Sequence, residues 1–380
     1  MNGELRQCRL CQSDAIRHRL QLDGSPSRVQ RLLDSASAPP DGGVNLTIYI
    51  CEDCGFVQVP RLVSDDYYDD YVMTTSHSQQ MQEYQLQQAE SFVLNFKLAG
   101  KAVLEIGCGD GNYLGHLKSA GSSVRGIEPS YPFRQLALSR GFDVLDAYVT
   151  RGYKVPGGPY DAFVTRQVLE HVEDPNEFLL AIRENLSESG VGLVEVPSLE
   201  QALENSRFYD FFPDHLNYFS AHTLRHALVR NGFEVLEVSR GMGGEYNVAL
   251  VRRTPTPDLT RLDVARRSTC AEFLEFVSAQ RAASRRVALW GAGGKGLALL
   301  SLSGSPELAY VVDTDPHKQG KFTPSGKFPI YSPERLLADP VDAVVVTALA
   351  YEREILTQLR DLPYRGAIVL LGEHLRVAQV

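Results

Sequence analysis

The sequence predicts an α/β protein in three parts: a short cysteine-containing module, a Rossmann-like α/β domain and a second Rossmann-like α/β domain. Two series of apolar strand patterns alternate with helical patterns, the first from residue 101 and the second from residue 285. Such alternation is typical of a parallel sheet with helices on both faces. The proline-containing stretch TPTPD separates the two series. We place the domain boundaries at 1–75, 76–255 and 256–380.

Composition and charge exclude several classes of partner. The chain has 380 residues, of which 43% are apolar and 22% charged, and its formal net charge is −9. An acidic chain is a poor binder of nucleic-acid phosphates. No apolar run approaches the ~18 residues of a membrane span, and the first residues lack a signal-peptide pattern. We expect a cytoplasmic protein without nucleic-acid or membrane partners; its oligomeric state stays open.

Four of the six cysteines form two C-x-x-C pairs. Cys8 and Cys11 make the first pair, and Cys51 and Cys54 make the second. Four thiolates close a tetrahedral site around Zn²⁺ and leave no position for water. Gly55, directly after the second pair, permits a turn that brings backbone amides close to sulfur. We therefore expect one structural zinc on these four residues; the alternative is two unrelated pairs of buried cysteines.

A helix is expected from about Gln79, and the first α/β series follows it. After a helix at 222–231, two apolar runs around GMGG predict an antiparallel hairpin that closes the sheet. The other elements of this series are expected as strands at 102–106, 123–127, 143–147, 160–165 and 191–196 and as helices near 112–120, 131–140 and 175–187.

The turn after the first strand carries the glycine-rich motif E-I-G-C-G-D-G. Gly107, Gly109 and Gly111 let a ligand approach the backbone between a strand and a helix. Dehydrogenases use related glycines, but here the carboxylate of Glu105 ends the strand before them. Glu128 ends the next strand, where its carboxylate can accept both hydroxyls of a ribose. This combination predicts a class I methyltransferase domain that binds S-adenosylmethionine (SAM).

Residues at the ends of the next strands extend the expected SAM site. Asp146 is expected near the adenine, with an exposed loop carboxylate as the alternative. Gln167 and the turn Leu169-Glu170-His171 are expected to border the methionine end. We expect His171 to be structural rather than catalytic, and Cys108 to fill space within the glycine loop.

Together these motifs resemble the zinc-containing, SAM-dependent sugar C-methyltransferases that act on nucleotide-linked 4-keto deoxysugars. The resemblance implies C-methylation through an enolate beside a ketone, and it implies that Tyr71 and His77 contact the substrate. It spans nearly the whole chain and rests on C-R-L-C, C-E-D-C-G-F-V-Q, Y-V-M-T-T-S-H-S, E-I-G-C-G-D-G, L-E-H-V, W-G-A-G-G-K-G and V-V-D-T-D-P-H-K-Q-G-K.

The catalytic segment departs from the Tyr-x-Glu-His pattern of that family, because Phe212-Pro213-Asp214-His215 stands in its place. The resemblance implies His215 as the base, with Asp214 tuning it and Tyr209 or Tyr218 near the developing oxyanion. A packing or helix-capping histidine is the alternative for His215, and aromatic core packing for the two tyrosines. The departure keeps open an O- or N-methyltransferase acting on another small molecule.

The second α/β series opens with another glycine loop. Gly291, Gly293 and Gly296 precede Asp313 at the next strand end, which is a dinucleotide-type fingerprint. An NAD-dependent sugar oxidoreductase is therefore an alternative function, although about 90 residues are too few for a full dinucleotide domain and a substrate domain. We expect Gly293 and Lys295 to bind the diphosphate of a nucleotide-linked sugar lying between the last two domains; a purely structural loop is the alternative.

Overall fold

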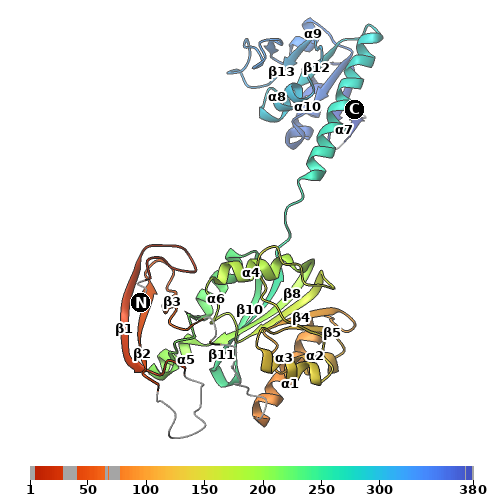
Figure 1. Ribbon diagram of the computed structural model, residues 1–380. Helices are drawn as coiled ribbons and strands as arrows, with labels where there is room; N and C mark the ends of the chain where they lie inside the picture. The colour runs from red at the N-terminus through yellow and green to blue at the C-terminus, as the bar shows by residue number, and fades with distance from the viewer. Residues whose placement is uncertain (1–4, 29–40, 65–66, 68–77, 373, 379–380) are drawn as a thin grey trace. The chain divides into compact units, whose positions relative to one another are not determined.

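The computed structural model describes residues 5–28, 41–64, 67, 78–372 and 374–378 (Figure 1). Tyr71 and His77, the two substrate residues expected near the end of the N-terminal module, lie outside these ranges. The chain forms two compact units, residues 1–255 and 256–380. Each unit has its own sheets and cores and is described by itself.

The N-terminal module is built on a four-stranded sheet in the order β1-β2-β3-β9. Strands β1 and β2 form a long antiparallel hairpin. Strand β9 comes from a distant part of the chain and pairs with β3, so the module and the next domain share one sheet. The bounds are β1 Ile16–Ser25, β2 Val44–Cys51, β3 Val57–Gln58 and β9 Asn217–Tyr218.

The seven-stranded sheet of the first unit has the order β10-β11-β8-β7-β4-β5-β6. Strands β4 to β8 run parallel, and β10 and β11 form the antiparallel closing hairpin. The order reverses between β4 and β7, which opens a crevice at the carboxyl ends of these strands. The bounds are β4 Ala102–Ile106, β5 Ser123–Ile127, β6 Val144–Leu145, β7 Tyr160–Arg166, β8 Leu186–Pro197, β10 Phe233–Gly241 and β11 Tyr246–Arg253.

Helices cover both faces of this sheet. Figure 1 shows α1, α2 and α3 on one face and α4 and α6 on the other. Alternate residues of a strand enter the two separate cores: Val103 packs with α1 and α2, whereas Leu104 packs with α4 and α6. The bounds are α1 Gln79–Asn95, α2 Asn112–Ser119, α3 Tyr131–Ser139, α4 Pro175–Glu184, α5 Leu199–Glu204, η2 Phe208–Asp210, α6 Ala221–Arg230 and η3 Met242–Gly244.

The second unit begins with the long helix α7 and has a six-stranded sheet in the order β14-β13-β12-β15-β16-β17. All strands except the edge strand β17 run parallel, so the second Rossmann-like domain has the predicted architecture. The bounds are α7 Thr260–Ala282, β12 Val287–Trp290, α8 Gly294–Leu302, β13 Tyr310–Val312, β14 Ile330–Tyr331, α9 Arg335–Ala338, β15 Ala343–Val346, η4 Leu349–Tyr351, α10 Glu352–Asp361, β16 Ala367–Leu371 and β17 Leu375–Val377.

The α/β strands and helices are found where the sequence predicts them, with shifts at their ends. The largest differences are in β6, which keeps two of the five expected residues, and in β8, which begins five residues early. Among the described residues, no helix is both long and apolar enough to cross a membrane.

Candidate active site

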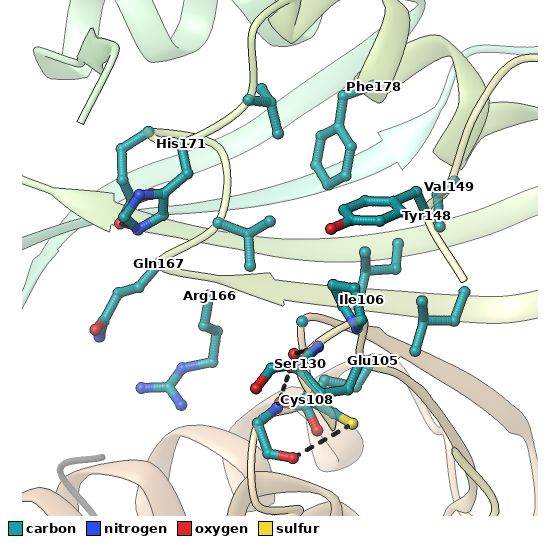
Figure 2. Close-up of a pocket in the computed structure, with 18 of the residues that line it drawn as sticks. Glu105, Ile106, Cys108, Ser130, Tyr148, Val149, Arg166, Gln167, His171 and Phe178 are labelled. Carbon is teal, nitrogen blue, oxygen red and sulfur yellow. Dashed lines mark hydrogen bonds and ion pairs between the residues drawn. The ribbon is translucent and has the colours of Figure 1, made fainter. Parts of the chain in front are cut away.

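A pocket of about 1110 Å³ lies at the carboxyl ends of β4, β5 and β7 (Figure 2). The glycine loop from Glu105 to Asp110 forms one wall, and Glu170, His171 and His215 form another. Arg61 of the N-terminal module also reaches the lining. The pocket therefore joins the expected cofactor residues to part of the expected catalytic segment.

The glycine loop is tied to the end of β5 by a carboxylate. Glu128 is buried, and its two oxygens accept hydrogen bonds from the backbone N–H groups of Gly109 and Ser130, each at 2.8 Å. An ionised carboxylate has about four acceptor sites, so two remain for a ligand. Burial raises the pKa of Glu128, and the two amide hydrogen bonds oppose that rise.

The three loop glycines serve different purposes. A Cβ on Gly107 would lie 2.3 Å from Val168, and a Cβ on Gly111 would lie 2.8 Å from Phe142. Both positions therefore need glycine for packing. A Cβ on Gly109 would meet no described atom within 4 Å, because this residue faces the pocket, and its φ of +53° also favours glycine.

Glu105 is buried beneath the loop at the end of β4. Its Oε2 atom has no hydrogen-bond partner among the described residues. Burial raises the pKa of Glu105 to about 8, although nearby Arg166 lowers it. A buried carboxylate oxygen without a partner is costly, and a cationic ligand group would satisfy it.

Arg166 is a pocket residue that the sequence analysis missed. Its NH2 group lies 2.7 Å from Glu195 Oε1, and its guanidinium carbon lies 4.4 Å from the centre of the Tyr113 ring. Gln167 follows it with a φ of +56°, and its Nε2 atom lies 3.4 Å from the same Glu195 oxygen. Figure 2 shows the side chains of Arg166 and Gln167 extending from the end of β7.

Asp146 does not face the pocket as expected for an adenine ligand. Its carboxylate pairs with Arg134 at 2.8 Å, and its side chain is 68% exposed. The neighbouring residues instead supply pocket surface: Tyr148 and Phe178 both line it, and Figure 2 shows their rings on the same side as Val149. Asp146 follows β6, which ends at Leu145, and its carboxylate turns to Arg134 rather than into the pocket.

Two histidines of the pocket lining contact one another. The rings of His171 and His215 are perpendicular, with centroids 4.6 Å apart. Burial lowers the pKa of both rings, and the field of His171 adds to the lowering at His215. Metal-ligating atoms of His171, His215 and Glu170 lie within 4.8 Å of one another. Burial raises the pKa of Glu170 to about 8.

Asp214 is directed at His171 and not at His215. Its carboxylate Oδ2 lies 3.6 Å from His171 Nδ1, and its backbone oxygen lies 3.0 Å from the same nitrogen. Burial raises the pKa of the Asp214 carboxyl, and the facing His171 ring opposes the rise. Asp214 therefore contacts His171 and not His215, its neighbour in the sequence, because the side chains of Asp214 and His215 point in different directions from the turn.

The two expected tyrosines do not present their hydroxyls to the pocket. The Tyr218 hydroxyl donates to the Phe212 carbonyl at 3.3 Å and accepts from the Phe212 N–H at 2.7 Å, so it holds the turn around His215. Tyr209 lies on η2 and is 62% exposed. Tyr246 of β11 lines the pocket instead, and burial raises its pKa to about 12.

The N-terminal module supports the segment that carries His215. Strand β3 pairs with β9 directly after His215, and Arg9 NH1 donates to the carbonyl oxygens of Val59 and Leu216 at 2.8 and 3.0 Å. The module is therefore linked by hydrogen bonds to the segment that follows His215.

The four cysteine sulfurs cluster at the base of this module, with all four within 4.8 Å of one another. The Sγ atoms of Cys8 and Cys54 are 3.7 Å apart, and those of Cys11 and Cys51 are 3.5 Å apart. A zinc tetrahedron with ~2.3 Å Zn–S bonds has edges of about 3.8 Å. The cluster is therefore close to the size that zinc requires.

In the second unit, the loop after β12 is held by a carboxylate in the same way as the glycine loop of the first unit. Asp313 accepts hydrogen bonds from the N–H groups of Ala292 at 2.8 Å and Asp315 at 2.9 Å, and Lys318 Nζ lies 3.1 Å from it. A Cβ on Gly293 would meet no described atom within 4 Å. Lys295 is exposed at the start of α8.

Comparison with known proteins identifies both units. A family model described as a methyltransferase domain matches residues 78–238, and one described as a C-methyltransferase C-terminal domain matches residues 259–371. The C-methyltransferase NovU from Streptomyces niveus is 26% identical and is covered over 93% of its length by 95% of this chain. An uncharacterized methyltransferase from Anoxybacillus flavithermus is 35% identical over 20% of this chain and 36% of its own.

Solved structures resemble about half of the chain. The magnesium protoporphyrin IX methyltransferase from Synechocystis, solved with bound S-adenosylhomocysteine (SAH), is 17% identical, with 49% of this chain and 90% of that chain covered and a TM-score of 0.38. The PH0226 protein from Pyrococcus horikoshii is 16% identical, with 50% and 100% covered and a TM-score of 0.41.

The two family models follow one another along the chain, and the full-length relative spans both. The class I fold, predicted from the sequence, is confirmed. The chain is a SAM-dependent methyltransferase whose second unit matches the C-methyltransferase C-terminal domain.

Proposed function

We propose that this enzyme transfers the methyl group of SAM to the carbon beside the ketone of a nucleotide-linked keto-deoxysugar, with His215 as the base. The observation that carries the proposal is the pair of half-buried histidines that line the same pocket as the glycine loop. The full-length relative NovU, a C-methyltransferase by name, supports transfer to carbon.

The residues of the pocket fit SAM, which when bound supplies an electrophilic methyl group on its sulfonium. Glu128 has two free acceptor sites for the ribose hydroxyls. The buried carboxylate of Glu105 lacks a hydrogen-bond partner within the described part of the chain and suits the cationic amino group. Gly109 keeps the loop surface open.

A neutral histidine suits removal of a carbon-bound proton. The pKa of His215 is lowered by burial and by His171, so its ring is unprotonated at neutral pH and has a lone pair to accept the proton. As His215 takes this proton, the carbon acid would become an enolate, whose carbon would form the new bond to the methyl group while the methyl–sulfur bond breaks, its electron pair returns to sulfur and SAH leaves. Asp214 acts on this pair through His171, which it holds in orientation.

A hydrogen-bond donor stabilises the developing oxyanion. Tyr246 is better suited than Tyr209 or Tyr218, because it lines the pocket and its raised pKa keeps its hydroxyl protonated. The Tyr218 hydroxyl already bonds to the backbone of Phe212, where it positions the turn.

We also propose that one Zn²⁺ binds Cys8, Cys11, Cys51 and Cys54. Four sulfur ligands leave no open position, so the metal would stabilise the module rather than take part in methyl transfer. Its effect on the reaction would pass through the β3–β9 pairing to the turn at His215.

For the second unit, we propose that the loop at Gly293 and Lys295 binds the nucleotide diphosphate of the acceptor. The open backbone at Gly293 and the cationic Lys295 suit phosphate oxygens. Asp313 accepts hydrogen bonds from backbone N–H groups of its loop, as Glu128 does in the first unit, and would accept a ribose hydroxyl. The C-methyltransferase domain match of this unit favours acceptor binding over redox chemistry.

Locating the transferred methyl group tests the proposal. The enzyme is incubated with SAM carrying a ¹³C-methyl group and a nucleotide-linked 4-keto deoxysugar, and the product is examined by NMR. We expect a carbon-bound methyl group, and we expect the acidic proton to exchange with solvent deuterium in wild type but not in His215→Ala. A methyl group bound to oxygen or nitrogen would favour the alternative O- or N-methyltransferase.

A further inference from the structure

Arg166 is a buried cation at the cofactor end of the pocket. Its side chain is 8% exposed, yet it borders the pocket between the glycine loop and Tyr246. Its Nε atom is buried and has no hydrogen-bond partner in the described part of the chain. A buried, incompletely satisfied guanidinium is costly unless an anion completes it.

A network of polar groups holds this guanidinium. Glu195 is fully buried; its Oε1 atom accepts from Arg166 at 2.7 Å, while its Oε2 atom accepts from Tyr84 Oη at 2.6 Å and Gln88 Nε2 at 2.8 Å. The face of the guanidinium rests on Tyr113. Arg166 is therefore held on one edge and one face, and helix α1 supplies two of the supporting groups.

The methionine end of SAM carries a carboxylate and an ammonium group. Glu105 lies near Arg166, whose positive charge lowers the pKa of the Glu105 carboxyl. Glu105 Oε2 and Arg166 Nε are both buried and have no hydrogen-bond partner in the described structure. A carboxyl group and a guanidinium close together complement such a zwitterion, because an ammonium group that binds Glu105 favours the ionised form of its carboxyl. Planar guanidinium groups bind carboxylates through parallel hydrogen bonds.

We propose that Arg166 binds the methionine carboxylate of SAM, with Glu195, Tyr84 and Gln88 as positioning residues that orient it. This inference rests on SAM as the methyl donor and assigns a binding role to a residue outside the glycine motif. This role would also account for the position of α1 beside the pocket. Gln85 of α1 lines the pocket and accepts a hydrogen bond from Asn112 Nδ2 at 2.7 Å.

Calorimetry with three ligands isolates the carboxylate. The ligands are SAH, decarboxylated SAH, and 5′-methylthioadenosine, which lacks the whole amino-acid part. Wild type should bind SAH about 10- to 100-fold more tightly than decarboxylated SAH. In Arg166→Met this ratio should approach one, while the affinity for 5′-methylthioadenosine changes less than about twofold. Arg166→Lys, which keeps a point charge, should give an intermediate ratio.

Two further variants separate orientation from folding. Tyr84→Phe removes one hydrogen bond to Glu195 and should lower the SAH ratio severalfold without affecting 5′-methylthioadenosine. Arg240→Met is the matched control, because Arg240 forms a similar pair with Glu204 at the surface, and all three affinities should stay the same. If Arg166→Met does not fold, Arg166→Lys and Tyr84→Phe carry the test.

Two results would overturn the proposal. An unchanged ratio of SAH to decarboxylated SAH in Arg166→Lys and Tyr84→Phe would show that the carboxylate binds elsewhere. Equal weakening of all three ligands would show that Arg166 only supports the fold. If wild type bound none of the three ligands, the SAM site itself, rather than the role of Arg166, would be wrong.

Discussion

Replacement of Glu128 by alanine should weaken cofactor binding through the ribose. The carboxylate holds the N–H groups of Gly109 and Ser130 at 2.8 Å each and has about two acceptor sites left for the ribose hydroxyls. A hydrogen bond to a charged group contributes about 1.5–3 kcal/mol, which corresponds to about 10- to 150-fold in affinity. Release of the Gly109 amide adds disorder in the loop, so we expect the upper part of this range.

Isothermal titration of SAH measures the effect, and a neighbouring carboxylate supplies the control. Asp146 leaves the adjacent strand end but pairs with Arg134 and is largely exposed, so Asp146→Ala should change SAH affinity less than about twofold. Thermal unfolding of both variants without ligand checks the fold. Wild-type affinity in Glu128→Ala would refute the ribose assignment, and a large loss in Asp146→Ala would restore Asp146 as an adenine ligand.

Three other predictions concern the metal, the base and a buried acid. Protein purified without chelator should contain one zinc per chain, and Cys51→Ser should lower the thermal midpoint and reduce kcat more than SAH affinity, because β3 supports the turn at His215; a zinc content far below one contradicts this. His215→Ala should lose about 10²–10⁴ in rate and retain SAH affinity by calorimetry; nearly full turnover would exclude it as the base. Burial raises the pKa of Glu170 from 4.5 to about 8, so its contribution to stability is present below about pH 4.5 and is lost as pH rises through about 8. Urea unfolding from pH 5 to 8 should therefore show a flatter pH dependence in Glu170→Gln than in wild type, with the exposed Glu204→Gln as control; parallel curves would mean that Glu170 does not titrate in this window.

Local sequence patterns were sufficient for most strands and helices of the first α/β domain and for the glycine loop of the second. Strand, glycine turn and helix are consecutive in the chain, so the loop from Glu105 to Gly111 and the loop at Gly291 could be predicted from short stretches. The pairs Cys8/Cys11 and Cys51/Cys54 predicted a cluster, because two C-x-x-C pairs are typical of a four-cysteine zinc site. The roles of the individual site residues stay predictions.

The hairpin of β1 and β2 was not predicted. All ten residues of β1 are exposed or half-buried, so the alternation of Ile16, Leu20 and Leu22 with polar residues does not mark a fully buried face. Strand β9 has only two residues, and its pairing with β3 joins segments about 160 residues apart in the chain. No local pattern encodes such a pairing.

By itself, the sequence determined the fold class and the two glycine loops, because each depends on residues that are close together in the chain, and it predicted the cysteine cluster from two C-x-x-C pairs. The tertiary structure decided which side chains face one another. It turned Asp214 to His171, Asp146 to Arg134 and the Tyr218 hydroxyl to the backbone. It also brought Arg166 to Glu195 from the end of a neighbouring strand. Side-chain direction depends on packing between distant segments, so these pairings exist only once the chain is folded.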